Sequence, residues 1–477
     1  MIEEYGNLPY GSLEKRCCTE EDAAERLLAE AMEGFHKKIV VLDDDPTGVQ
    51  TVHDVSVYTD WEEDSIRQGF LEKESMFFIL TNSRSFSAEE TERVHREIAK
   101  RVGNVSKELN QDFMIISRGD STLRGHYPLE TEILADELQK SAGLASDGEV
   151  FCPFFPEGGR FTLDNVHYVK DRDELVPAGM TEFAKDKTFG YRNSELCSYI
   201  EEKTKGRCQK EDCIVISLEE LNRLDVPGIK KKLMCAQNMT RIVVNAVTYG
   251  DLKVFCAALV LAMKEGKRYL ARSAAALPKV IGRISEQPLL GRKQLEKEVK
   301  NGGIVLIGSH VKKTTDQLAA LQTLTGNIVF LEFQVNSCLV ENGLEREVLD
   351  IVSKAEDVIL EGKTAVIYTS RTLLAPETMS PEEKLQISVR ISDAVTSIIG
   401  KLKTKPRFII AKGGITSSDV GKKALHVKKA RVMGQVKKGI PVWMTGAESK
   451  FPGMPYIIFP GNVGEVGTLK EIVEELM

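Results

Sequence analysis

Short apolar runs alternate with polar loops and helical stretches along most of this chain. The runs form two series: KIVVL, MFFIL, FMIIS, CIVIS and RIVVN in the first part, and GIVLI, TAVIY, RFIIA and YIIF in the second. Continuous apolar runs of this length, bounded by polar residues, are typical of strands buried in a parallel sheet. After the second run, Ser87 and Glu90 form a capping box that predicts the start of a helix. The pattern therefore predicts an α/β protein.

A stretch that mixes proline, glycine and charge separates the two series of strands. It spans residues 273–303, and we place a domain boundary within it, near 290–300. The expected fold is therefore two domains, residues 1–290 and 300–477, each a mainly parallel sheet flanked by helices. We expect the active site in the cleft between them.

Composition narrows the class of protein. The 477 residues are 42% hydrophobic and 28% charged, which suits a soluble globular chain with ample core. The net charge of -7 argues against a sequence-independent nucleic-acid binder, which normally carries a basic face. No apolar run is long enough for a membrane span, and the first residues lack a signal-peptide core, so we expect a cytoplasmic protein.

The cysteines do not favour a zinc site. The chain has nine of them and no CxxC pair, and Cys208 and Cys213 lack the matching His or Cys partners that zinc would need.

Two polar loops follow strands of the first series. Three aspartates, Asp43 to Asp45, directly follow the run IVVL, and the segment SRGDSTLRG, with Asp120, Ser121 and Arg124, follows FMII. Ligands of open α/β sheets bind at the carboxyl ends of strands, so we expect both loops to open on one crevice. Carboxylates accept hydrogen bonds from hydroxyl groups, and an arginine such as Arg124 can clamp a carboxylate. The loops therefore predict a pocket for a small hydroxylated acid.

A purely structural explanation of these loops remains open. Asp45 precedes a proline and can simply begin a turn, and Asp120 can simply pair with Arg118 or Arg124. A third loop, which carries Arg84 after the run MFFIL, adds to the case for a binding site.

Glycine-rich loops follow strands of the second series. KGGITSSD follows RFIIA, GSH (Gly308 to His310) follows GIVLI, and GNVGEVG follows YIIF. Glycines let a phosphate approach the backbone closely, so three such loops in one domain favour a nucleotide site. We expect Thr314 and Gln317 to form a capping box, and Ser417, Ser418 or Asp419 to cap the helix after KGG. Neither the P-loop pattern nor the dinucleotide pattern GxGxxG is present.

Six motifs occur in the same order as in a known family. DDDPTGV, DSTLRG, PFFPEGGR, GSH, KGGITSSD and PGNVG, between about Ile39 and Gly464, resemble the motifs of the four-carbon acid sugar kinase family, once a domain of unknown function. The resemblance implies an N-terminal substrate domain and a C-terminal ATP-binding domain. It also implies transfer of the γ-phosphate of ATP, with Mg²⁺, to a hydroxyl of a small sugar acid such as threonate, erythronate or an oxo-tetronate.

The resemblance also assigns residues, motif by motif. On the substrate side it implies Asp44, Asp45, Arg84, Asp120, Ser121 and Arg124; on the ATP side it implies Ser309, Gly413, Gly414, Ile415, Thr416 and Gly461. It assigns no metal ligand. Better-known tetronate kinases carry a His-rich, Pro-Met segment where this chain reads VPAGMTEFAKDKTFGYRNSEL, a difference that bears on the choice of acid.

Asp120 is the preferred general base, because flanking arginines keep a carboxylate ionised, and Asp45 is the alternative. Three other classes of protein are alternatives to a kinase. An NAD-dependent hydroxyacid dehydrogenase would need the missing dinucleotide pattern, and a phosphatase or aldolase would leave the glycine loops unexplained. A non-catalytic sugar-acid-binding protein would need an output module. The expected partners are a sugar acid and ATP, not nucleic acid or a membrane, and a homodimer is possible.

Overall fold

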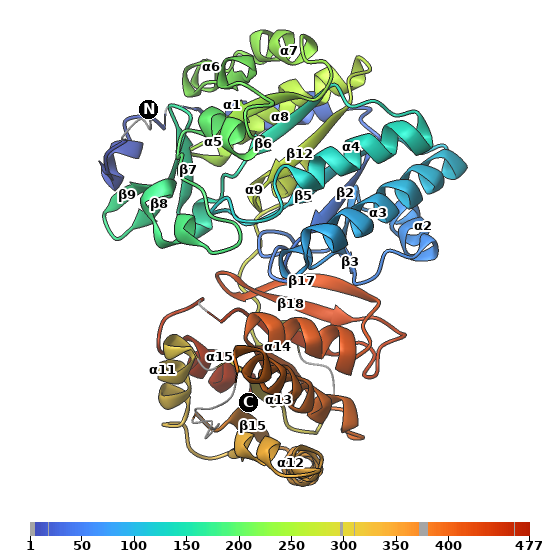
Figure 1. The fold of residues 1–477 in the computed structure, drawn as a ribbon, viewed down its shortest axis with the longest axis vertical. Coiled ribbons are helices and arrows are strands. Elements are labelled where there is room, and N and C mark those ends of the chain that lie inside the picture. The colour runs from blue at the N-terminus through green and yellow to red at the C-terminus, as the bar shows by residue number, and fades with distance from the viewer. Residues whose placement is uncertain (1–4, 18, 296–298, 310, 372–379, 462) are drawn as a thin grey trace. The chain divides into compact units, whose positions relative to one another are not determined.

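The computed structural model of the protein describes residues 5–17, 19–295, 299–309, 311–371, 380–461 and 463–477. The chain forms two α/β units, each with a mainly parallel sheet flanked by helices (Figure 1). The first unit contains the chain up to Val52 and Asp60–Ser285. The second unit contains His53–Thr59 and Glu286–Met477. The predicted two-domain α/β class is confirmed.

The sheet of the first unit is parallel throughout. Its strands lie in the order β10 (Ile214–Ile216), β11 (Thr240–Val244), β6 (Gly148–Cys152), β12 (Tyr269–Ser273), β5 (Phe113–Arg118), β2 (Lys38–Asp43) and β4 (Met76–Leu80). β2 lies between β4 and β5, so the loops that follow these three strands leave the sheet side by side. All five runs of the first predicted series are strands of this sheet.

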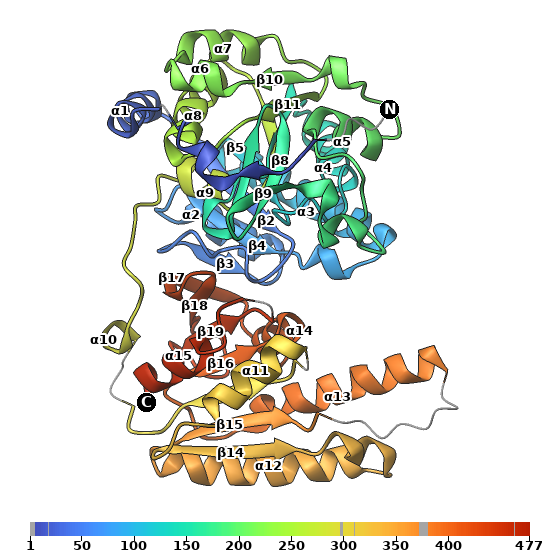
Figure 2. The ribbon, with the colours of Figure 1, turned by 90° about the vertical axis from the view of Figure 1, so that its left-hand side faces the viewer.

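Helices cover both faces of this sheet. α3 (Ala88–Leu109) and α4 (Leu129–Ala142) pack together on one face, and α1 (Glu21–Met32) and α8 (Tyr249–Lys264) pack together on the other (Figure 2). The Ser87 side chain accepts a hydrogen bond from the Glu90 amide, so the predicted cap of α3 is confirmed. The remaining helices of this unit are α2 (Glu63–Leu71), α5 (Leu196–Lys203), α6 (Leu218–Asn222), α7 (Val226–Met234) and α9 (Ala276–Ile281).

A second, antiparallel sheet belongs to the first unit and was not predicted. Its strands lie in the order β1 (Leu8–Pro9), β9 (Glu174–Pro177), β8 (Val166–Asp171) and β7 (Arg160–Leu163). These strands are short and carry no long apolar run, so the sequence gives them no strong periodic signal. They matter because β7 and β8 carry side chains to the loop after β5.

The sheet of the second unit joins a parallel part to an antiparallel part. Its strands lie in the order β3 (Ser56–Tyr58), β17 (Lys429–Lys437), β18 (Ile440–Thr445), β19 (Pro455–Phe459), β16 (Ile409–Lys412), β13 (Ile304–Ile307), β15 (Thr364–Thr369) and β14 (Ile328–Phe333). The pairs from β19 to β14 are parallel, and those from β3 to β19 are antiparallel. All four runs of the second predicted series are strands here.

Strand β3 comes from the N-terminal part of the sequence. It pairs with β17, with Val57 opposite Ala430, and the backbone of Asp54 donates to the carbonyl of Val432. Val57 and Tyr58 are each only 1% exposed. The chain therefore contributes seven residues to the second unit and then returns to the first.

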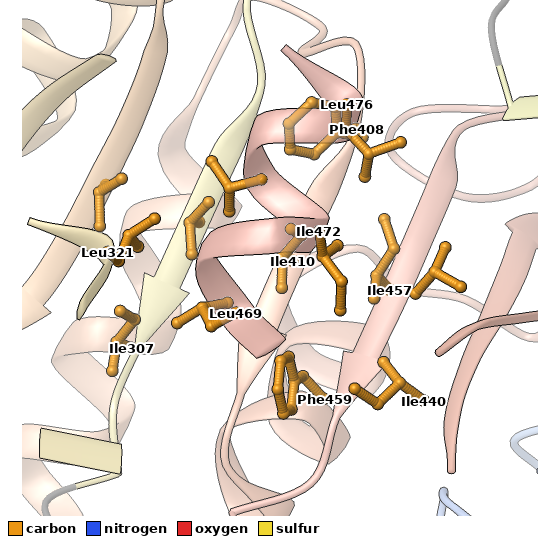
Figure 3. Close-up of a cluster of buried hydrophobic side chains, with 14 of the residues drawn as sticks. Ile307, Leu321, Phe408, Ile410, Ile440, Ile457, Phe459, Leu469, Ile472 and Leu476 are labelled. Carbon is orange, nitrogen blue, oxygen red and sulfur yellow. The ribbon is translucent and has the colours of Figure 1, made fainter. Parts of the chain in front are cut away.

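The core of the second unit forms between its parallel strands and its last helix. Leu469, Ile472 and Leu476 of α15 (Thr468–Leu476) pack against the strand residues Ile410 and Ile457 (Figure 3). Burial of each such side chain contributes about 1.5–3 kcal/mol. The other helices are α10 (Arg292–Leu295), α11 (Lys312–Leu321), α12 (Gly343–Leu360), α13 (Pro381–Lys401) and α14 (Gly414–Asp419). Within the described ranges, none of the helices has the length and apolar character needed to cross a membrane.

Candidate functional site

Three loops of the first unit meet at one edge of its sheet. Asp43 ends β2, Arg84 lies in a short helix (Ser83–Ser85) after β4, and Asp120 follows β5. Because the three strands are parallel neighbours, their carboxyl ends lie together. The residues that we expected to line one crevice of this unit therefore lie at the same edge of its sheet.

Arg84 joins carboxylates from two of these loops. Its guanidinium forms an ion pair with Asp45, its Nη1 lies 3.6 Å from Oδ1 of Asp120, and its Nε lies 3.8 Å from Oδ2 of Asp44. The side chains of Arg84 and Asp45 are 23% exposed and that of Asp120 is 13% exposed, whereas Asp44 is almost fully buried. A ligand can therefore reach Arg84, Asp45 and Asp120.

Asp43 and Asp44 form a buried layer beneath this surface. Arg118 Nη1 lies 3.2 Å from Asp43 and 3.5 Å from Asp44. Burial raises the pKa of Asp43 to about 7 against the opposing charge of Arg118, and burial also raises the pKa of Asp44. Neither carboxylate oxygen of Asp44 has a hydrogen-bond partner. Asp44 therefore keeps its acceptor capacity unused.

The pKa values of Asp120 and Asp45 are shifted in the opposite direction, below the usual range. Burial alone would raise the pKa of Asp120, but Arg84, Arg124 and the Thr122 hydroxyl outweigh it and hold the pKa well below its usual range. Burial is likewise outweighed at Asp45, where Arg84 and Thr47 lower the pKa. Both carboxylates are therefore ionised at neutral pH.

Arg124 is engaged by its own loop. Its Nε donates to Oδ2 of Asp120 at 2.7 Å, and its Nη1 lies 3.8 Å from Asp186. From the sequence we expected Arg124 to clamp a ligand carboxylate. The structure shows it paired with Asp120, which is the purely structural role that the sequence also allowed. The binding role of Arg124 stays a prediction.

Three buried side chains hold successive backbone carbonyls of this loop. His167 Nε2 donates to the carbonyl of Ser121, the Tyr191 hydroxyl to that of Thr122, and the Tyr199 hydroxyl to that of Leu123, each at 2.8 Å. Burial lowers the pKa of His167 to about 4, so the ring is neutral and its Nδ1 accepts from Thr162. Sequence reasoning missed these three residues because they lie 46 to 76 positions from the carbonyls they bind.

Arg272 explains the glycines of the same loop. Its guanidinium pairs with Glu130 and donates to Ser117 Oγ at 3.0 Å, with both arginine and glutamate fully buried. A Cβ atom at Gly125 would lie 2.6 Å from Nη2 of Arg272, and Gly125 also has a φ of +128°. Only glycine fits there. No sequence motif pointed to Arg272, which is the last residue but one of β12.

The acidic cluster is not a built metal site. No group of three or more His, Cys, Asp or Glu side chains in the described ranges could hold a metal ion. The oxygens of Asp43 and Asp45 instead face arginines. Mg²⁺ is commonly held by few carboxylates together with substrate phosphates, so a nucleotide would have to bring most of its ligands.

In the second unit, three loops likewise leave neighbouring parallel strands. Ser309 follows β13, Gly413 follows β16 and Gly461 follows β19, and these strands lie in the order β19, β16, β13. The Gly413 amide donates to the carbonyl of Phe459 at 2.9 Å, and the Thr314 hydroxyl contacts both Ser309 Oγ and the carbonyl of Gly461. The predicted ATP-side residues therefore lie together. His310 lies outside the described residues.

The two glycines of KGGITSSD differ. Gly413 has a φ of +128°, which side-chain-bearing residues rarely adopt, and a Cβ there would lie 3.1 Å from Ser309 and Thr416. Gly414 has ordinary backbone angles, and a Cβ there would meet nothing within 4 Å. Ile415 is 73% exposed, while Thr416 is buried. Gly414 therefore borders open space.

Two predicted helix caps are wrong. α11 begins at Lys312, so Thr314 and Gln317 lie inside it, and Gln317 donates instead to the carbonyls of Val463 and Glu465. α14 begins at Gly414, so Ser417, Ser418 and Asp419 lie inside it. The observed N-cap lies three residues before the predicted one in α11 and at least four before it in α14. Thr314 and Gln317 bind other loops instead, whereas the Ser417 hydroxyl donates to the carbonyl of Gly413.

Two cations that sequence reasoning missed lie beside these loops. Lys412, with 0% exposure, donates to the carbonyls of Pro460 at 2.6 Å and Gly461 at 3.1 Å. Arg371 donates to the carbonyl of Ser309 at 2.7 Å, while its Nε and Nη2 are buried without a hydrogen-bond partner. Within the described part of the chain, no carboxylate lies within ion-pair distance of either one. Among the described residues, this edge of the sheet therefore holds two basic side chains without a carboxylate within ion-pair distance, although Glu332 attracts Arg371 from farther away.

Burial, with Lys313 nearby, lowers the pKa of Lys412 to about 7. A bound anion would favour the charged form of the lysine and raise that pKa again.

Comparison with known proteins agrees with the division of the chain into two units. Residues 39–281 match a family of sugar-binding N-terminal domains, and residues 304–469 match a family of nucleotide-binding C-terminal domains. No curated protein matches the chain.

Two solved structures share the fold. One is a protein of Salmonella typhimurium LT2 with the provisional description tRNA synthase; it has 16% identity and a TM-score of 0.67, and the match covers 93% of this chain and 100% of that one. The other is a Haemophilus influenzae protein of the DUF1537 family, with 18% identity and a TM-score of 0.58, over 92% of this chain and 100% of that one. Together with the two domain matches and the ordered motifs, these findings show that the chain belongs to the four-carbon acid sugar kinase family.

Proposed function

We propose that the protein is an ATP-dependent kinase that phosphorylates a hydroxyl of a four- or five-carbon sugar acid of the threonate, erythronate and oxo-tetronate class. The observation that carries the proposal is the pair of basic side chains at the second site. Lys412 and Arg371 lie beside glycine loops without a carboxylate partner in the described ranges, within the unit that matches nucleotide-binding domains. Phosphate groups would supply the missing negative charge.

The first site supports the other half of the proposal. Asp45 and Asp120 are ionised and partly exposed, so they can accept hydrogen bonds from the hydroxyls of a sugar acid. Asp44 has two unused oxygens directly behind them. Ser121 and Arg124 complete the loop that the family motif assigns to the substrate.

Phosphoryl transfer depends on positioning and on neutralisation of charge more than on covalent chemistry. We propose that Asp120 orients the attacking hydroxyl and takes up its proton, with Asp45 as the alternative. Ser309, Gly413, Gly414, Ile415, Thr416 and Gly461 would hold the ATP phosphates, with Lys412 fixing the carbonyls of one loop. Mg²⁺, when bound with ATP, supplies further charge neutralisation. The cleft expected between the two domains stays a prediction.

A binding experiment separates the two sites. Isothermal titration with a non-hydrolysable ATP analogue should show binding that Arg371→Ala weakens about tenfold, because a hydrogen bond from a charged group is worth about 1.5–3 kcal/mol. Threonate binding should be unchanged in that variant. Arg346→Ala, a change of an exposed arginine in the same unit, is the matched control. Binding of NAD in place of the ATP analogue would point to a dehydrogenase and refute the proposal.

A further inference from the structure

Arg160 stands apart from the other arginines of the first site. Arg84, Arg118, Arg124 and Arg272 each form an ion pair with an aspartate or glutamate. Among the described residues, no carboxylate lies within ion-pair distance of Arg160. Its Nη1 donates to the carbonyl of Gly158, and its Nε is buried without any hydrogen-bond partner. Arg160 is therefore a half-buried cation that Asp120 and Glu182 attract only from beyond ion-pair distance.

A tight turn fixes the backbone of Arg160. The residue begins β7, and its amide and carbonyl both bond to Phe155, at 2.9 and 3.0 Å. The turn belongs to the motif PFFPEGGR, for which neither the sequence pattern nor the active-site residues above supplied a role. The base of the side chain is thus held in one place.

An aromatic ring places the guanidinium beside the substrate loop. The guanidinium carbons of Arg124 and Arg160 lie 5.0 and 5.7 Å from the centre of the Phe183 ring. Arg124 is paired with Asp120, which also attracts Arg160 electrostatically. Arg160 therefore lies near Asp120, and its neighbour Arg124 carries the same positive charge. The single carboxylate of Asp120 is shared among Arg84, Arg124 and Arg160.

A half-buried charge without an ion-pair partner carries a free-energy cost, and a ligand of opposite charge can remove that cost. Burial lowers the pKa of Arg160, which shows that the surroundings disfavour the charged form. A planar guanidinium with a free Nε matches a carboxylate, which accepts two parallel hydrogen bonds. Surface arginines of this chain that are paired, such as Arg223 with Glu219, lack this property.

We propose that Arg160 binds the carboxylate of the sugar acid, with Phe183 orienting the guanidinium. This inference rests on the proposed function and deepens it. The hydroxyls of the acid would then lie toward Asp120 and Asp45, and Arg124 would hold Asp120 rather than the ligand. Phe183 belongs to the segment VPAGMTEFAKDKTFGYRNSEL, in which this chain differs from better-known tetronate kinases.

The test compares an acid with its neutral analogue on the full-length protein. Isothermal titration measures the affinity for threonate and for threitol, which has a hydroxymethyl group in place of the carboxylate. Arg160→Met should weaken threonate binding about 10- to 100-fold, the loss expected for a charged hydrogen bond, and leave threitol binding unchanged. Arg160→Lys should fall between wild type and Arg160→Met, because it keeps the charge and loses the fork. Arg223→Met, which removes an exposed arginine of the same unit, should behave as wild type.

Two results would overturn the inference while leaving the proposed function in place. One is a wild-type threonate affinity in Arg160→Met. The other is an equal loss for threonate and threitol with a lowered melting temperature, which would mean that Arg160 only stabilises the turn at Gly158. If the wild-type protein bound the ATP analogue but no sugar acid of the panel, the proposed function would fail, and this inference with it.

Discussion

The charge of Asp120 is set by two arginines and a hydroxyl. These contacts outweigh the effect of burial and hold the pKa of Asp120 well below its usual range. A carboxylate with a low pKa is a weak base. In phosphoryl transfer the transition state is loose, so the acceptor hydroxyl needs to lose its proton only late. Asp120 therefore acts in this account mainly by orienting the hydroxyl.

Asp120→Asn should lower turnover about 100-fold or more, because the amide places a donor where the hydroxyl needs an acceptor. Binding of the non-hydrolysable ATP analogue should stay at the wild-type level. Asp171→Asn, an exposed aspartate of the same unit, serves as the control in steady-state assays. Turnover close to wild type would remove Asp120 from the mechanism.

His167 gives the loop after β5 a dependence on pH. Its folded-state pKa of about 4 lies below the ordinary value of 6.5, so folding favours the neutral ring. The stability that the neutral ring contributes is fully present above about pH 6.5 and is lost as the pH falls toward 4. At about 1.4 kcal/mol for each pKa unit, the loss is about 3 kcal/mol at most.

His167→Gln should remove this part of the pH dependence, since glutamine can donate to the Ser121 carbonyl at any pH. Urea unfolding at pH 5 and pH 7.5, followed by circular dichroism, measures the difference. The variant should lose less stability than wild type between pH 7.5 and pH 5, and His36→Gln, an exposed histidine, should match wild type. Identical pH dependence in His167→Gln and wild type would contradict the role of the ring.

At the scale of elements, parallel strands bring the loops of each site together. The apolar runs predicted β2, β4 and β5, and with them the meeting of Asp45, Arg84 and Asp120. They did so because buried strands leave a strong local signal, and because loops at their carboxyl ends share an edge. The same reasoning placed Ser309, Gly413 and Gly461 together.

The paired substitutions Gly413→Ala and Gly414→Ala test the second site. Gly413 has a φ of +128°, so alanine there should lower the melting temperature. Gly414 borders open space, so alanine there should leave the melting temperature near wild type and weaken binding of the ATP analogue. Melting temperature and affinity are measured on the same preparations. Unchanged affinity in Gly414→Ala would refute a phosphate site at this loop.

Side-chain partners were harder to predict than strands. Long sequence separations divide the loop after β5 from its partners Arg160, His167 and Arg272. The antiparallel sheet brings Arg160 and His167 to this loop, and the end of β12 brings Arg272. Lys412 and Arg371 became candidates only when the structure showed that, among the described residues, neither has a carboxylate within ion-pair distance. The predicted cap at Thr314 failed because its hydroxyl has a tertiary partner in the carbonyl of Gly461, whereas Ser417 lies inside its helix and donates to the carbonyl of Gly413 four residues earlier.

At the scale of the whole molecule, the chain divides its N-terminal part between two units. Residues 53–59, which include β3, belong to the second unit and follow the loop that holds Asp45. Seven residues have too little pattern to reveal such an exchange, which depends on a long-range pairing with β17. The homodimer that the sequence left open stays a prediction.

A fragment of residues 286–477 should be less stable than the same fragment with residues 52–60 attached through a flexible linker. Without β3, the backbone groups of β17 that pair with it lose their partners. Thermal unfolding of the two fragments gives the comparison, with a scrambled 52–60 segment as the control. Equal melting temperatures would show that β3 adds nothing to the second unit.

The most direct test of the account is a coupled assay of the full-length protein with ATP, Mg²⁺ and a panel of four- and five-carbon sugar acids. ADP release should require both ATP and an acid, and phosphorus NMR should show a new phosphate-ester signal on the acid. Asp120→Asn should lower the rate of both signals about 100-fold or more. Absence of ADP and of phosphate ester with every acid, or turnover of NAD(H) in their place, would contradict the assignment as a sugar-acid kinase.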